Sequence, residues 1–308
     1  MSLVEQIGKM IIAGQVEVTV VLLVAVGHGQ ESIPVPLFQS IFGLVFPPLK
    51  PYFSTDKSPP KRGATRGTAM VDMHAICTDL HAEHAALDTL LVGLDEAAWD
   101  TPTPAPGWMV RDQISHLGST DRTAIIAAAE PQRFATEILT QPREHRAAAQ
   151  LAVGRNMPGA ELLAWWRAGC SAMLDVLRRL DAKTRIPWFG PPMSALSFAT
   201  ARLMETWAHG QDIVDALGLT RPATERLRHV AHLGVLARPF SYTTHSQTAP
   251  ADPVYVALHS PSGASWTWGD ATAVNRVTGP ALDFCLVVTQ RRHMADTSLQ
   301  IVGPAATE

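Results

Sequence analysis

The sequence has few cysteines and no apolar run long enough to cross a membrane. Cys77, Cys170 and Cys285 are widely spaced and form no CxxC pair, which excludes a disulfide framework and a thiolate zinc knuckle. The most apolar N-terminal segment, 18-VTVVLLVAVG-27, is too short, because a membrane span needs about 20 apolar residues. It also lacks the charged start and the cleavage site of a signal peptide. We therefore expect a cytoplasmic protein without a membrane span.

Lysine is scarce as well, and the chain carries no excess of positive charge. Only five of the 25 basic residues are lysine, and the net charge is -3. This balance gives no basic surface for nucleic acid or acidic lipid, so small neutral or anionic metabolites are the expected partners. The sequence also has no G-x-S-x-G, no P-loop and no complete G-x-G-x-x-G, which argues against serine hydrolase and nucleotide chemistry.

Residues 1–69 differ in composition from the rest of the chain. The segment 46–67 is rich in Pro, Lys, Ser and Gly, a composition typical of an extended linker. Three interpretations remain open for this extension: a start codon assigned too early, with Met70 or Met73 as the true start, a flexible extension, or an anchor at a membrane surface.

From residue 70 to about 220 the pattern is helical. Apolar residues recur at spacings of three, four and seven, which predicts helices with one buried face. Pro142 is expected to divide or kink the third helical segment, and Gly218 to cap the last one. The expected helical segments are 71–99, 110–129, 131–152, 159–181 and 194–217. Four long amphipathic helices with one additional segment indicate a helix bundle.

After residue 220 the pattern changes. Residues 221–250 are expected to form a linking helix and a loop. The segments 253–260 and 264–270 alternate apolar and polar residues around 261-PSG-263, which predicts a β-hairpin. A helix over 280–293 and a strand over 298–303 complete a small α+β domain at 251–308. The expected fold is thus mainly α, a four-helix bundle followed by this small domain.

One bundle helix carries an unusual polar stripe. The segment 202-RLMETWAHGQD-212 places four ionisable residues three, four and three positions apart: Arg202, Glu205, His209 and Asp212. A helix turns about 100° per residue, so they share roughly one face. Buried charges are costly unless they are paired or bind metal. Glu205 and His209 could converge on one ion, and His116, in an apolar setting on the second helix, is the best third ligand.

Interpretations without a metal stay open for the stripe and for the other histidines of the bundle. The stripe could be an intrahelical charge ladder, with Arg202 paired to Glu205 and His209 bonded to a backbone carbonyl. His74, His81 and His84 cluster on the first helix, where a solvated face is the expected explanation. A set of two histidines and one carboxylate suits zinc or another divalent ion, and with three protein ligands it leaves exchangeable positions.

At these residues the sequence resembles a known family. The segments 107-GWMVRDQISHL-117, 187–218 and 278–293 are similar to actinobacterial metal-binding proteins of the mycothiol-dependent maleylpyruvate isomerase family, over about residues 70–302. The resemblance implies a DinB-like four-helix bundle in which His116, Glu205 and His209 bind a divalent metal, usually zinc. Family members continue beyond the position of Glu308, so the resemblance also implies a C-terminal domain without its final helix.

The resemblance further implies thiol chemistry. A metal-bound thiol such as mycothiol would act as a thiolate in isomerisation or S-transfer on a small molecule. Arg202 and Asp212 are the candidate catalytic residues. Arg291 and Arg292 are candidates for binding the cofactor or a substrate carboxylate, with a solvated helix end as the alternative. Two other functions stay open: a non-catalytic metal- or ligand-binding module, and a metal-dependent hydrolase that uses bound water.

Overall fold

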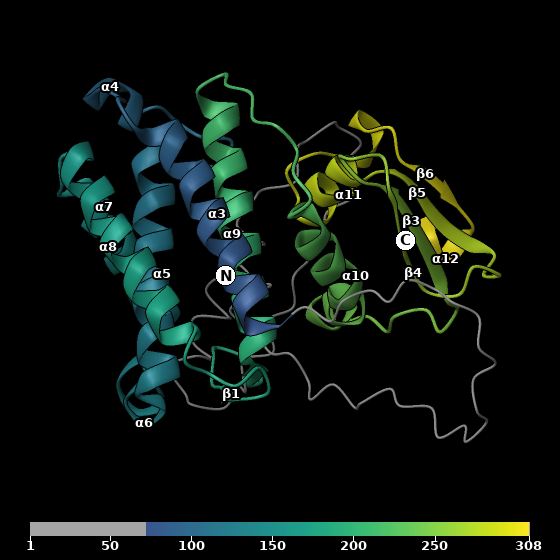
Figure 1. Cartoon of the computed structure of the whole chain (residues 1–308), viewed down its shortest axis with the longest axis horizontal. Coiled ribbons are helices and arrows are strands. Elements are labelled where there is room, and N and C mark those ends of the chain that lie inside the picture. Colours follow the sequence, from purple (N-terminus) through teal and green to yellow (C-terminus); the bar gives the residue numbers. More distant parts are fainter. Residues whose placement is uncertain (1–71, 308) are drawn as a thin grey trace, which may run out of the picture. The chain divides into compact units, whose positions relative to one another are not determined.

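Four long helices form the bundle that the apolar periodicity predicts (Figure 1). The structure is a computed structural model and describes residues 72–307, all within one unit of the chain. The predicted extension 1–69 lies outside the described residues. The bundle helices are α3 (Met73–Leu91), α5 (Val110–Ala129), α8 (Gly159–Leu177) and α9 (Ala195–Ala216). The shorter helices beside them are α4 (Glu96–Trp99), α6 (Pro131–Arg133) and α7 (Arg143–Arg155).

Local signals in the sequence determine where these helices begin and end. The Asp72 side chain caps α3 by accepting a hydrogen bond from the Ala75 N–H at 2.8 Å. Ser194 caps α9 in the same way. The chain leaves α9 at Gly218, whose φ of 61° is a left-handed conformation that glycine adopts without steric cost. Pro142 separates α7 from the π-helical turn before it, which confirms the predicted division.

The apolar core begins inside the bundle and continues toward the C-terminal sheet. Helices α5 and α8 approach each other closely at Gly118, where a Cβ atom would collide with the ring of Trp165. A tight two-stranded pair, β1 (Arg185–Ile186) and β2 (Met193–Ser194), leads into α9. One continuous cluster of buried side chains extends from Phe198 of α9 to Leu258 in the sheet.

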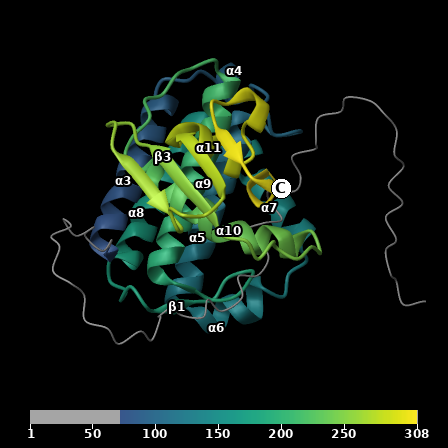
Figure 2. The same ribbon diagram turned by 90° about the vertical axis from the view of Figure 1, so that its right-hand side faces the viewer.

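The C-terminal region contains a four-stranded sheet, part of which faces the viewer in Figure 2. Its strands follow the order β4-β3-β5-β6 and are labelled in Figure 1. The predicted hairpin is confirmed, because β3 (Val254–His259) and β4 (Ser265–Trp268) pair antiparallel. Strand β5 (Asn275–Pro280), which pairs parallel with β3, is not predicted from the sequence pattern. Its residues include Gly279 and Pro280, which interrupt the alternating pattern. The last strand, β6 (Gln300–Val302), and the short α12 (Pro304–Thr307) end the described chain.

The predicted helix over 280–293 is shorter than expected. Helix α11 (Ala281–Val288) ends because Gln290 adopts a φ of 60° and the Arg291 N–H turns back to the Leu286 carbonyl at 2.7 Å. Arg291 and Arg292 therefore lie in the turn after α11. Helix α10 (Leu227–Thr244) packs against both α9 and α11, and so joins the bundle to the sheet (Figure 1). Within residues 72–307, no helix has the length and apolar character needed to cross a membrane.

Candidate metal centre

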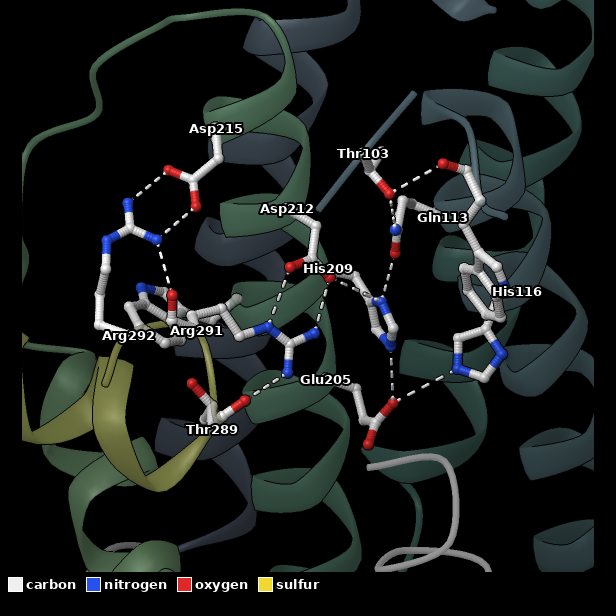
Figure 3. Close-up of polar contacts among 12 residues, drawn as sticks. Thr103, Gln113, His116, Glu205, His209, Asp212, Asp215, Thr289, Arg291 and Arg292 are labelled. Atoms are coloured by element: carbon white, nitrogen blue, oxygen red, sulfur yellow. Dashed lines mark hydrogen bonds and ion pairs between the residues drawn. The ribbon is translucent and has the colours of Figure 1, made fainter. Parts of the chain in front are cut away.

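The three residues predicted to bind a metal lie together where α5 packs against α9 (Figure 3). The Nε2 atoms of His116 and His209 are each 3.4 Å from Oε2 of Glu205. One potential ligand atom from each residue lies within 4.8 Å of the other two. All three side chains are largely shielded from solvent, with 14% of His116, 12% of Glu205 and 9% of His209 exposed. The spacing of Glu205 and His209 along α9 and the close approach of α5 thus produce a convergent set of potential ligands.

Gln113 determines which nitrogen of His209 carries the proton. Nδ1 of His209 lies 2.6 Å from the amide oxygen of Gln113. The amide cannot be reversed without loss, because its nitrogen donates to the Thr103 hydroxyl at 2.9 Å, and that hydroxyl donates to the Trp108 carbonyl at 3.0 Å. Nδ1 must therefore donate, which leaves the lone pair of His209 on Nε2, facing Glu205.

A second glutamine, Gln150 on another helix, contacts His116. Nδ1 of His116 lies 3.1 Å from the amide oxygen of Gln150 on α7, and Nε2 of the same ring faces Glu205. The backbone carbonyl of Gln150 accepts a hydrogen bond from the Ser115 hydroxyl of α5. When no proton occupies the space between them, two imidazole nitrogens and a carboxylate oxygen converge as acceptors. Such a set of acceptors is stabilised by a cation at their centre, and the residues therefore fit a metal ion.

The electrostatics of the three groups agree with this role. Burial would raise the pKa of Glu205, but its contacts with His116 and His209 hold that pKa well below its ordinary value. Burial lowers the pKa of His116, so its imidazole is neutral. The pKa of His209 is raised, although burial opposes this, because Asp212 and Glu205 stabilise its charged form. Without a metal, His209 thus attracts a proton to the position that a cation would occupy.

Asp212 contributes to the centre from its edge. Its Oδ2 lies 3.5 Å from Nδ1 of His209, farther than the amide oxygen of Gln113. Arg291 holds the same carboxylate through two contacts, at 2.7 and 3.1 Å, and its side chain is only 7% exposed (Figure 3). The interpretation of Arg291 as part of a solvated helix end is therefore wrong. Arg292 pairs with Asp215 and is more exposed.

Arg202 faces a different carboxylate from the one expected. Its Nε donates to Oδ1 of Asp121 on α5 at 3.0 Å, and both side chains are almost completely buried. Glu205 instead contacts His116, also on α5. The stripe on α9 is therefore directed toward α5, and the interpretation of an Arg202–Glu205 ladder within one helix is wrong. Arg202 influences Glu205 only through its charge, which helps to lower the pKa of that carboxyl.

Sequence reasoning missed Gln113 and Gln150 as supporting residues. Gln113 lies three residues before His116 and on the same helix face, a spacing that could have suggested its role. Gln150 had no such signal, because it comes from a segment whose position only the folded chain determines.

A helix bundle with a histidine on its second long helix and a Glu-x-x-x-His pair on its fourth belongs to the DinB-like class. The family model described as "Mycothiol maleylpyruvate isomerase N-terminal domain" matches residues 80–214. An uncharacterized protein of Mycobacterium tuberculosis, found in strains CDC 1551 and H37Rv, is 45% identical over 243 residues, which cover 77% of this chain and 93% of the relative. The chain belongs to the mycothiol-dependent maleylpyruvate isomerase family.

Two solved structures share the fold. A crystal structure of mycothiol-dependent maleylpyruvate isomerase has a TM-score of 0.52 and 14% identity, and covers 71% of this chain and 89% of its own. A crystal structure of a mutant of that enzyme has a TM-score of 0.54 and 13% identity, and the match covers 75% of this chain and 93% of the mutant chain. A second family model, described as "Wyosine base formation", matches residues 250–299, which contain β3, β4, β5 and α11 but none of the three convergent residues.

We expect the Gln113→Ala substitution to weaken divalent metal binding about 10–100-fold, as is typical when a ligating histidine loses its outer partner. The reason is that Nδ1 of His209 would lose its acceptor, so the imidazole could rotate and change tautomer. The matched control is Gln211→Ala, because Gln211 donates to Asp215 rather than to a ligand. Competition titration with a chromophoric chelator measures both affinities. Equal affinities in the two variants would show that Gln113 does not support the centre.

Proposed function

We propose that the protein binds a divalent metal, best fitted by zinc, through His116, Glu205 and His209, and uses mycothiol to transform a small molecule. The observation that supports this most directly is the convergence described above, in which two imidazole nitrogens face one carboxylate oxygen. Two nitrogens and one oxygen are ligands that zinc accepts in catalytic sites. Membership of the family adds the thiol to this proposal.

A bound divalent ion with only three protein ligands would hold an added thiol as its thiolate at neutral pH, which is the nucleophile that isomerisation and S-transfer both need. Residues of the chain would hold the proposed ligands in place. The amide oxygens of Gln113 and Gln150 each contact Nδ1 of one imidazole, and Glu205 remains ionised because of its neighbours. Arg291 holds Asp212 beside His209, so the C-terminal region helps to order the centre.

The proposed reactions differ in what happens after the thiol attacks. Addition to an activated double bond, rotation and departure of the same thiol give cis-trans isomerisation, whereas displacement of a leaving group gives S-transfer. The candidate roles of Arg202, Asp212, Arg291 and Arg292 toward an anionic substrate or the cofactor remain predictions, with Arg202 and Arg291 already paired to carboxylates. A cytoplasmic location is part of the proposal, because Cys77, Cys170 and Cys285 are all free thiols.

Elemental analysis of the purified protein, followed by calorimetric titration with mycothiol, tests the proposed function. We expect bound zinc and saturable mycothiol binding that disappears after the metal is removed by chelation and returns when zinc is restored. Bound zinc without thiol binding would support a non-catalytic module instead. Zinc-dependent cleavage of esters or amides without any thiol would support a hydrolase. Either result would overturn the thiol mechanism.

A further inference from the structure

A second group of metal-ligating side chains lies in the bundle core, outside the centre described above. His84 comes from α3, Asp121 from α5 and Cys170 from α8, and all three residues are buried. One ligand atom of each lies within 4.8 Å of those of the other two. Asp121 follows His116 by five residues on α5, which corresponds to about 7.5 Å along the helix. The two groups thus occupy different levels of the bundle.

His84 is the most unusual member of this group. Only 5% of the residue is exposed, and neither ring nitrogen has a hydrogen-bond partner among residues 72–307. Its ring meets the edge of Trp166 at a centroid distance of 5.8 Å. Burial lowers the pKa of His84 to about 4, so the ring is neutral and keeps one free lone pair. A buried polar group without a partner costs about 1–3 kcal/mol, which calls for an explanation such as a bound ion.

The Asp121 carboxylate is oriented so that its two oxygens have different neighbours. The Arg202 guanidinium takes Oδ1, with Nε at 3.0 Å and Nη2 at 2.9 Å. The other oxygen, Oδ2, is directed to Cys170, whose Sγ lies 3.6 Å away. Arg202 therefore acts as a positioning residue that holds the carboxylate and leaves Oδ2 available as a ligand.

Cys170 completes the set with a sulfur atom. Burial and the nearby Asp121 raise the pKa of its thiol far above the ordinary value, so the free thiol stays protonated. A metal ion replaces that proton, because zinc binds the thiolate form and coordination deprotonates a thiol outright. The Cys170 thiolate and the Asp121 carboxylate, which also pairs with Arg202, would then place two negative charges beside a divalent ion.

We propose that His84, Asp121 and Cys170 form a second metal site, which takes zinc or another thiophilic divalent ion and ties α3, α5 and α8 together. Metal–ligand bonds of about 2.0–2.3 Å would bring tetrahedral ligand atoms to about 3.3–3.8 Å from one another, so small side-chain movements would close the site. Because the group is buried, the ion enters as the bundle folds. The site differs from the first in containing sulfur.

Cobalt substitution distinguishes the two centres, because only the second contains a thiolate. We expect the full chain, folded with Co²⁺ under reducing anaerobic conditions, to bind two equivalents and to show a near-ultraviolet thiolate-to-cobalt charge-transfer band. The Cys170→Ala variant should lose the band and one equivalent. The matched control Cys285→Ala, which removes a buried thiol of α11, should keep both. The His116→Ala variant should lose one equivalent but keep the band.

Titration of the unsubstituted protein decides the question even if Cys170→Ala fails to fold. One equivalent without a charge-transfer band would overturn the second site and leave the first one untouched, whereas no bound cobalt would overturn both. A band that persists in Cys170→Ala would also overturn it. Loss of mycothiol binding with the band retained would instead count against the proposed function alone.

Discussion

Replacing Glu205 by glutamine is expected to remove one equivalent of bound metal per chain and, with it, the binding of mycothiol. Glu205 is the carboxylate that both imidazoles face, so the amide would leave two neutral ligands and no compensating charge. The affinity loss should exceed the ~10–100-fold that an outer partner costs. The variants His116→Ala and His209→Ala should behave alike. Elemental analysis and calorimetry with mycothiol measure the two effects.

The Glu161→Gln variant is the matched control, because Glu161 is an exposed carboxylate in the first turn of α8. It should retain full metal and thiol binding. Circular dichroism should show unchanged helix content in all four variants, since none of the substitutions removes an apolar core side chain. If the three variants at the centre hold as much metal as the control, the ligand assignment is wrong.

Replacing Arg202 by methionine is expected to lower the free energy of unfolding by about 3–5 kcal/mol. The side chains of Arg202 and Asp121 are only 4% and 1% exposed, so the variant would leave an uncompensated carboxylate in the bundle core. Urea unfolding with a chelator present measures the loss without a metal contribution. The Arg133→Met variant is the matched control, because Arg133 pairs with Glu137 at the surface and should change stability little.

A double variant separates the charge effect from lost packing. Combining Arg202→Met with Asp121→Leu removes both charges, and we expect it to recover much of the stability lost in the single variant. If Arg202→Met alone is as stable as Arg133→Met, Arg202 and Asp121 do not form a buried ion pair in solution, and the role of Arg202 as a positioning residue fails with it.

Local sequence signals were sufficient for the bundle but not for the sheet. The helix caps at Asp72 and Ser194 and the break at Pro142 act within a few residues, so they can be read directly. Strand β5 is different, because its partner β3 lies about 20 residues earlier and pairs with it in parallel. Nothing within 275–280 identifies that partner. The same limit applies to the end of α11, which the turn at Gln290 determines.

Within the candidate centre, the sequence by itself determined that Glu205 and His209 share one face of an apolar helix, because helical periodicity is a local property. It also indicated His116 through its apolar setting. Only the tertiary structure decided the partners. It placed Gln113 rather than Asp212 closest to His209, and paired Arg202 with Asp121 across two helices.

The same distinction applies to His84, for which the expected solvated face is wrong. His84 lies near Glu83 in the sequence, which suggested a solvated face, yet both residues are buried. Glu83 is charged and buried because Arg226, at the start of α10, pairs with it from 143 residues away at 2.7 Å. A charged side chain can be buried only where an oppositely charged side chain lies beside it. The tertiary packing of the chain, rather than the neighbouring residues in the sequence, determines where that partner lies. The sequence therefore determined which residues could do chemistry here, while tertiary packing decided which of them meet.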